Sequence, residues 1–457
     1  MKSSSAGHFE PRIIIHGGAG NITRPNLPPN RQESYKTSLL RILKHGNDLL
    51  QNGVSALEAA TSTVSLFEDD PLFNCGHGAV FNRAGGIELE ASVMVSSGYK
   101  KSCAAVSLLR HVKNPILLAR NILEHGEQDL EEASAGAQGH VHISGPTAED
   151  LAKAYGLELK PQSYFWTRKR WEEHKRGLQS KLANEKVPSC EEFRGLEGLD
   201  DQEPPWDGFE YLPQGTVGCV AADVHGVICT ATSTGGLTNK LPGRIGDTPT
   251  VGAGFWAEEG ILLNIDEFDS VDSAMFPATE SVYGTLAPIV AFLPSVLTDC
   301  LPFSTTTKGY QHLTALTEKP TVPATHALAL SGTGNGDSFL RVSACRTAGA
   351  LALPPQALMS MLPKMSLSDK TAVSGITLRA ALKAVAGPGG LLQQSAGDRW
   401  NRTGEGEGGI IGIERRGKDT DVVFDMNSSG MFRAYIDSSG RTMVGIFRGD
   451  DEVVHNP

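Results

Sequence analysis

Thr216 stands where a polar, proline-containing segment meets a strand expected over residues 216–223, and Gly215 precedes it. If the Gly215–Thr216 bond is cut, Thr216 gains a free α-amine with a reference pKa of about 7.7–8.0. That amine can take the proton from the hydroxyl group of the same residue, so one residue supplies both nucleophile and base. Glycine tolerates the strained backbone that such a cut requires. Threonine is also common at the start of a strand, and this position alone favours that ordinary interpretation.

A second segment, TSTGGLTNKLPGRIGD (232–247), carries an arginine and an aspartate three residues apart. The planar guanidinium group of Arg244 can hold a carboxylate through two parallel hydrogen bonds. The carboxylate of Asp247 suits an ammonium group. Together they could bind the zwitterionic end of an amino acid. Taken alone, the pair is more typical of a surface ion pair.

The third segment, SGTGNGD (331–337), combines backbone N–H groups with the hydroxyl group of Thr333, which suits stabilisation of an oxyanion. Its glycine spacing resembles a dinucleotide-binding loop. The acidic residue and the βαβ context of that fingerprint are missing, so we set this interpretation aside. The glycines of HGGAG (16–20) are interpreted as a tight turn after a buried strand rather than as a phosphate site.

These segments need strands and helices to position them. Strands are expected at 12–16, 87–95, 103–108, 216–223, 227–233 and 328–331, and a last hairpin over 409–414, 421–426 and 431–437. Helical spacing is expected at 33–52, 55–67, 115–125, 148–155, 338–351 and 371–387. Strands and helices alternate in each half, which predicts a mixed α and β fold.

The composition is that of an ordinary globular protein: 457 residues, 40 % hydrophobic and 20 % charged, with a net charge of -11. An acidic chain without a concentrated basic surface argues against nucleic acid or an anionic membrane as partner. The seven cysteines show neither a disulfide framework nor zinc-site spacing. The N-terminus lacks the apolar segment of a secretory signal, and we expect a cytoplasmic protein.

Two stretches lack clear apolar periodicity. Residues 158–214 are rich in charge and proline and predict a long surface linker. Their basic cluster, between Arg168 and Arg176, is interpreted as a solvated helix face. Residues 258–325 contain several prolines and no pattern, and we interpret them as an insertion.

Several blocks occur in an order that resembles the plant-type asparaginase family, which comprises isoaspartyl peptidases/L-asparaginases, glycosylasparaginases and threonine aspartases. The blocks are HGGAG (16–20), PLFNCGHGAVFN (71–82), ELEASVM (88–94), KNPILLAR (113–120), GTVGCVA (215–221), TSTGGLTNKLPGRIGD (232–247), GTGNGD (332–337), GGIIGIE (408–414) and NSSGMFR (427–433).

The resemblance implies an α+β fold, a four-layer αββα sandwich of the N-terminal nucleophile type. It also implies self-cleavage into an α chain (1–215, with a linker at 158–215) and a β chain (216–457) that together form one domain. The implied activity is hydrolysis of the β-amide of L-asparagine or of N-terminal isoaspartyl peptides, without an organic cofactor or catalytic metal. The implied assembly is a homodimer of cleaved αβ units.

The resemblance also assigns roles to single residues. It makes Thr216 the nucleophile, with Thr234 hydrogen-bonded to it, and places Thr333 and Gly334 in the oxyanion hole. The remaining substrate-site residues of the resemblance are Arg244 for the α-carboxylate, Asp247 and Gly336 for the α-amine, and Asn74 in the supporting loop. In some members that loop binds a structural sodium ion through backbone carbonyl groups.

Differences within the family narrow the function. Threonine aspartases lack the acid at the position of Asp247, because they cut inside a chain where no free α-amine exists. Glycosylasparaginases carry asparagine where Gly235 stands. Asp247 therefore favours a substrate with a free amine; a threonine aspartase-like endoprotease and an uncleaved binding scaffold remain the alternatives. Glu90 and Ser429 depart from the aspartate and glutamate that are usual in the family.

Overall fold

Two β-sheets form the centre of the fold in the computed structural model, which describes residues 9–99, 102–125, 136–179, 215–260, 326–353 and 376–454. The larger sheet has nine strands, in the order β13 (Glu452–Val454), β12 (Thr442–Phe447), β11 (Gly430–Ile436), β1 (Arg12–Gly20), β5 (Val217–Ala222), β6 (Ile228–Thr234), β2 (Leu89–Val95), β3 (Cys103–Leu109) and β4 (His142–Ser144). The smaller sheet has four strands, in the order β10 (Asp419–Met426), β9 (Gly408–Arg416), β8 (His326–Gly334) and β7 (Phe255–Gly260).

The surroundings of strand β1 explain why its residues Ile13, Ile14 and Ile15 are all apolar. Ile13 and Ile15 belong to the core on the helix side of the nine-stranded sheet, whereas Ile14 belongs to the core shared with the smaller sheet. Side chains alternate between the two faces of a strand, and a strand that is covered on both faces has no polar side to show. The middle of the larger sheet therefore lies between two hydrophobic cores.

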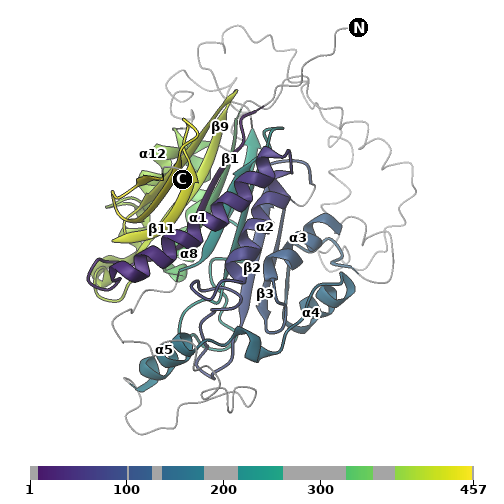
Figure 1. Ribbon diagram of the computed structural model, residues 1–457, viewed down its shortest axis with the longest axis vertical. Helices are drawn as coiled ribbons and strands as arrows, with labels where there is room; N and C mark the ends of the chain where they lie inside the picture. Colours follow the sequence, from purple (N-terminus) through teal and green to yellow (C-terminus); the bar gives the residue numbers. More distant parts are fainter. Residues whose placement is uncertain are drawn as a thin grey trace, which may run out of the picture. The chain divides into compact units, whose positions relative to one another are not determined.

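Helices cover the outer face of each sheet. α1 (Pro29–Gln51), α2 (Ala56–Glu68) and α3 (Pro115–His125) lie side by side on the nine-stranded sheet, as Figure 1 shows. α9 (Ala344–Ala352) and α12 (Leu378–Ala386) pack on the four-stranded sheet, accompanied by α8 (Gly336–Val342) and α13 (Leu391–Ala396). The mixed α and β class expected from the sequence is thus confirmed.

Local signals explain several boundaries. Ser55 accepts a hydrogen bond from the backbone N–H of Glu58 and caps α2, and Thr377 caps α12 in the same way through Ala380. Residues 338–351 do not form one helix, because Ser343 adopts a left-handed conformation (φ 46°) between α8 and α9. The expected helix 371–387 is described from Leu378 onward.

Two other expectations need correction, and two strands near the C-terminal end were not expected. HGGAG is not a turn after the strand: β1 continues to Gly20, with a register shift between His16 and Ala19. β9 and β10 form the expected hairpin, but β11 crosses to the larger sheet, where it pairs with β1 and β12. β12 and β13 were not predicted.

Part of the expected linker is helical. α5 (Arg168–Gln179) and the 3-10 turn Gln162–Phe165 fall inside it, after α4 (Gly145–Ala154). The helix face is not wholly solvated, because Arg170 and Glu173 are buried and form an ion pair at 3.0 Å. Residues 180–214 and 261–325, which include most of the proposed insertion, lie outside the described residues. None of the helices in the described part is long and apolar enough to cross a membrane.

Candidate active site

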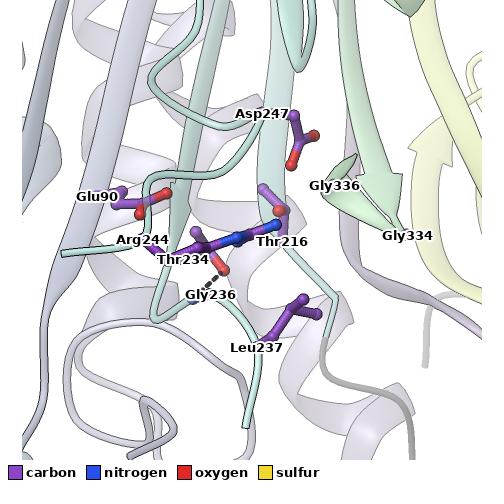
Figure 2. Close-up of a pocket in the computed structure, with 9 residues that line it drawn as sticks. All are labelled: Glu90, Thr216, Thr234, Gly236, Leu237, Arg244, Asp247, Gly334 and Gly336. Atoms are coloured by element: carbon purple, nitrogen blue, oxygen red, sulfur yellow. Dashed lines mark hydrogen bonds between the residues drawn. The ribbon is translucent and has the colours of Figure 1, made fainter. Parts of the chain in front are cut away.

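One pocket lies where strand ends from both sheets meet (Figure 2). Thr216 precedes β5 and Thr234 ends β6, while Gly334 ends β8 of the smaller sheet. The pocket is lined by Glu90, Thr216, Thr234, Gly236, Leu237, Arg244, Asp247, Gly334 and Gly336. Six of the residues singled out in the sequence therefore share one wall, although more than a hundred positions separate the first from the last.

The main chain at Thr216 is held by a buried histidine. The Nδ1 of His16 lies 2.9 Å from the carbonyl oxygen of Thr216, and its Nε2 lies 2.7 Å from Ser331 Oγ. A carbonyl only accepts, so Nδ1 carries the proton and Nε2 accepts from the serine hydroxyl. Complete burial lowers the pKa of His16 to about 3, which keeps the ring neutral.

The hydroxyl partner of Thr216 differs from the expected one. Thr216 Oγ1 lies 2.9 Å from Thr248 Oγ1. Thr234 lines the same pocket, but its hydroxyl accepts the backbone N–H of Gly236 at 3.0 Å, as Figure 2 shows, and no bond to Thr216 is formed in the described part of the chain. Sequence reasoning missed Thr248, although it directly follows Asp247 and is fully buried.

Gly215 is enclosed from two sides. A Cβ atom at this position would lie 2.5 Å from Gly18 Cα and 2.7 Å from Thr333 Oγ1. Atoms do not approach so closely, and therefore any side chain here would displace the Gly18 backbone or Thr333. Close approach is thus a reason for glycine at this position, in addition to the strain tolerance inferred from the sequence.

Arg244 and Asp247 reach the pocket with polar atoms left over. Within the described residues, Arg244 Nε and Asp247 Oδ2 are buried and have neither a hydrogen-bond nor an ion-pair partner. Arg244 Nη2 forms an ion pair with Asp337 at 3.2 Å, and the Asp337 side chain is half exposed. Buried polar groups are nearly always paired, so Nε and Oδ2 are available to bind polar groups of a substrate. A Cβ atom on Gly336 would lie 2.4 Å from Asp247 Oδ1, so glycine makes room for this carboxylate.

Burial dominates the electrostatics of Asp247. Desolvation raises its pKa to about 7, although the positive charge of Arg244 acts in the opposite direction. Glu90, which is fully buried, accepts the backbone N–H of Gly246 and lies 3.6 Å from Lys240 Nζ. Burial also raises the pKa of Glu90. Glu90, where the family usually has aspartate, therefore lines the pocket and binds the turn that carries Arg244 and Asp247.

Thr333 lies on the Gly215 side of the site rather than on the pocket wall. Its Oγ1 accepts the backbone N–H of Ala19 at 3.2 Å, and its own proton remains to be donated. Gly334 lines the pocket with φ +144°, a backbone conformation that favours glycine.

Asn74 is the predicted substrate-site residue that lies behind the pocket. Its side chain donates to the carbonyl group of Gly236 at 2.8 Å and accepts the N–H of Val80 at 3.0 Å. Its own carbonyl group accepts from Gly235. A Cβ atom on Gly235 would lie 2.7 Å from Asn74 Oδ1, so the asparagine of glycosylasparaginases has no room here.

The sequence matches the asparaginase family over residues 9–262, more than half of the chain. The protein belongs to this family. Among its relatives, an isoaspartyl peptidase of Escherichia coli (strain K12) is 40% identical over 245 residues, which cover 54% of this chain and 67% of the relative. A probable isoaspartyl peptidase/L-asparaginase 2 of Arabidopsis thaliana is 38% identical, covering 54% and 72%. The isoaspartyl peptidase/L-asparaginase of Bos taurus is 34% identical, covering 55% and 69%.

The resemblance stated from the sequence motifs is thus confirmed at the level of the family. In this asparaginase-family protein the matched region contains the Gly215–Thr216 junction and the turn that carries Arg244 and Asp247. It ends at residue 262, within the first residues of the insertion expected at 258–325. Within the described residues, no cluster of three or more His, Cys, Asp or Glu side chains could hold a metal ion.

Proposed function

We propose that the protein is a self-cleaving amidohydrolase that hydrolyses the β-amide of L-asparagine or of N-terminal isoaspartyl peptides and releases L-aspartate. One observation carries the proposal: the buried, unpartnered atoms of Arg244 and Asp247 face the same pocket as the Thr216 hydroxyl group. These atoms match the carboxylate and ammonium groups of a free amino acid. The names of the three relatives support this substrate class.

Substrate binding completes the unpaired groups. The α-carboxylate pairs with the guanidinium group of Arg244, and the α-ammonium group pairs with Asp247 beside Gly336. An ammonium group next to Asp247 lowers the pKa of that carboxyl group, which makes the pair fully charged near neutral pH. With both ends held, the β-amide carbonyl faces Thr216.

Self-cleavage creates the base. The Thr216 hydroxyl group attacks the Gly215 carbonyl, the peptide C–N bond breaks, and the hydroxyl proton ends on the new α-amine. Water then hydrolyses the ester and releases the Gly215 carboxylate. In each later cycle the amine takes the hydroxyl proton, Thr216 Oγ1 attacks the β-amide carbonyl, and ammonia or a peptide amine leaves with that proton. Water then hydrolyses the β-aspartyl ester and releases L-aspartate.

The oxyanion of each step is stabilised by the Thr333 hydroxyl and the Gly334 N–H. The bond that Thr333 Oγ1 accepts from Ala19 leaves the Thr333 hydroxyl proton to be donated, and in the proposal the oxyanion receives it. Donors fixed in advance lower the barrier, since they need not reorganise during the reaction.

The arrangement of helices and sheets supports the finer fold assignment. We infer a four-layer αββα sandwich of the N-terminal nucleophile type, in which α1, α2 and α3 form one outer layer and α8, α9, α12 and α13 form the other. The two chains made by cleavage, 1–215 and 216–457, stay together, because β1 pairs with β5 and with β11. The cleaved units are proposed to form a homodimer in the cytoplasm.

No organic cofactor or catalytic metal enters this chemistry. In the loop that contains Asn74, the positively charged guanidinium group of Arg170 donates hydrogen bonds to the carbonyl groups of Gly78 and Leu72, at 2.8 and 3.4 Å. A sodium ion bound to these carbonyl groups would be repelled by the guanidinium group. We therefore expect equal thermal stability in sodium and choline chloride.

Intact-mass analysis combined with aspartate-release assays on asparagine and an isoaspartyl dipeptide tests the function. We expect two fragments, the second beginning at Thr216, and release from at least one substrate. An uncut, inactive chain would favour the binding scaffold. Cleavage of an internal aspartyl sequence without asparagine turnover would favour the threonine aspartase-like activity.

A further inference from the structure

We propose that Thr248 is a further catalytic residue, which holds the Thr216 hydroxyl group in its attacking orientation before the free amine exists. The inference rests on the proposed function. Its basis is the 2.9 Å contact between Thr248 Oγ1 and Thr216 Oγ1, which is the hydrogen bond that the side chain of Thr216 makes within the described residues. Thr248 is fully buried and Thr216 is 5% exposed, so solvent offers little alternative.

The uncut chain needs such a partner. Before cleavage the nitrogen of Thr216 is an amide, which is not a base, so the first reaction proceeds without the acceptor that later cycles use. His16 cannot take this part, because its Nδ1 proton points to the Thr216 carbonyl and its Nε2 accepts from Ser331. Thr248 Oγ1 can accept the hydroxyl proton of Thr216 as a hydrogen bond, which directs an oxygen lone pair away from Thr248.

Thr248 is itself fixed by buried hydroxyl groups. Its carbonyl oxygen accepts from Ser92 Oγ at 2.6 Å, and Ser92 Oγ lies 2.7 Å from Thr232 Oγ1. Each hydroxyl has one proton, so the bonds run from Thr232 to Ser92 and from Ser92 to the Thr248 carbonyl. Ser92 lies on β2 and Thr232 on β6, two neighbouring strands of the larger sheet. The main chain of Thr248 is therefore held by hydroxyl groups on two paired strands of the larger sheet.

The chemical step leaves Thr248 unchanged. A bond forms between Thr216 Oγ1 and the Gly215 carbonyl carbon, the bond from that carbon to the Thr216 nitrogen breaks, and the hydroxyl proton finishes on this nitrogen. Thr248 accepts a hydrogen bond from the Thr216 hydroxyl group before the attack, and it can donate its own hydroxyl proton to the same oxygen once that oxygen has lost its proton. In the mature enzyme the same contact orients the hydroxyl group toward the β-amide.

The test compares Thr248→Val, which keeps the shape and removes the hydroxyl, with Thr248→Ser, which keeps the hydroxyl. Thr250→Ala is the matched control, because Thr250 lies in the same turn and bonds the Gly246 carbonyl at 2.8 Å instead of the nucleophile. The full-length chains are made by cell-free synthesis, and the disappearance of the intact mass is followed in time. Steady-state kcat and KM for aspartate release and the Tm are measured on the same proteins.

We expect Thr248→Val to slow self-cleavage and to lower kcat by about tenfold or more, with KM changed less than about twofold. Thr248→Ser and Thr250→Ala should stay within about threefold of the wild type. The proposal is overturned if Thr248→Val cleaves and turns over at the wild-type rate, or if Thr248→Ser is as slow as Thr248→Val. If Thr248→Val does not fold, the serine variant still decides. A wild type that neither cleaves nor releases aspartate refutes the proposed function instead.

Discussion

The two sides of the pocket are built in opposite ways. On the nucleophile side, Thr216 is hydrogen-bonded through its hydroxyl and its carbonyl group, and its partners Thr248 and His16 are fully buried and bonded in turn. On the amino-acid side, Arg244 and Asp247 keep buried atoms without partners. The hydrogen bonds of the first side are formed within the protein, whereas we expect the substrate to pair the free atoms of the second. In the proposed mechanism the reacting group is held in advance, and the groups that bind the substrate are left unpaired at a cost in stability.

The largest effect is expected at the nucleophile. Thr216→Ala removes the attacking oxygen, so the chain should remain at its full mass of 48.6 kDa and release no aspartate. Intact-mass analysis and an aspartate assay measure both. A wild type that is fully active as one uncut chain would contradict the mechanism, because the α-amine base would then be absent.

The next effect is expected on the amino-acid side, where Asp247 would bind the ammonium group of the substrate. Asp247→Ala removes one partner of a buried charged pair, which costs roughly 2–5 kcal/mol in binding of the transition state. N-acetylation of the substrate removes the other partner and adds bulk beside Gly336. We expect both changes to abolish most of the kcat/KM for asparagine and isoaspartyl dipeptides.

Equal rates on free and N-acetylated substrate would mean that Asp247 does not bind the α-ammonium group of the substrate. The threonine aspartase-like alternative would then be the better hypothesis. The comparison needs one preparation of wild-type protein and a matched pair of substrates, so differences in folding cannot enter.

A smaller effect is expected at the carboxylate end. Arg244→Lys keeps the positive charge but loses the planar pair of donors. Substrate hydrolysis should fall by tenfold or more, which is about 1.4 kcal/mol. Self-cleavage should continue at a rate close to that of the wild type, because the scissile bond is within the chain and needs no carboxylate clamp. Unchanged hydrolysis would show that the substrate carboxylate is held elsewhere.

The smallest effect concerns the stability of the substrate-free protein. The pKa of Asp247 is raised by burial to about 7 in the folded protein, above its usual value, so the folded state binds this proton more tightly than the unfolded state. Stability should therefore fall as pH rises from about 4 to 7, and the full penalty remains above pH 7.

Asp247→Asn removes the penalty, and we expect a higher Tm than the wild type at pH 8 and nearly the same Tm at pH 4. Thermal unfolding of both proteins at the two pH values measures the difference. A lower Tm at pH 8 would show that the ionised carboxylate is stabilised by Arg244 more than it is penalised by burial. The comparison between the two sides of the pocket would then fail.

Much of the candidate site could be read from the sequence because its residues stand in short, dense blocks. Thr216, Arg244 and Asp247 have side chains whose chemistry is specific at those spacings, and the family match includes them. Strand β1 could also be predicted, because Ile13, Ile14 and Ile15 form an uninterrupted apolar run, as expected for a strand that is covered on both faces. That Asp247 binds the free amine of the substrate stays a prediction. It is supported by the buried Oδ2 atom of Asp247, which has no hydrogen-bond partner within the described residues.

Other features depend on contacts between distant segments. Thr248 and Ser92 are ordinary hydroxyl residues in the sequence, and only the folded chain brings Thr248 Oγ1 to Thr216 Oγ1 and Ser92 Oγ to the Thr248 carbonyl group. Arg170 was interpreted as solvated because its neighbours are charged, yet it reaches carbonyl groups some ninety positions away. HGGAG is strand rather than turn because β11 pairs with His16, Ala19 and Gly20, and β5 also pairs with His16. The sequence by itself determined which chemistry the chain carries, since that depends on residue types. The tertiary structure decided which groups are paired and which await a substrate, since pairing depends on distances that no local pattern encodes.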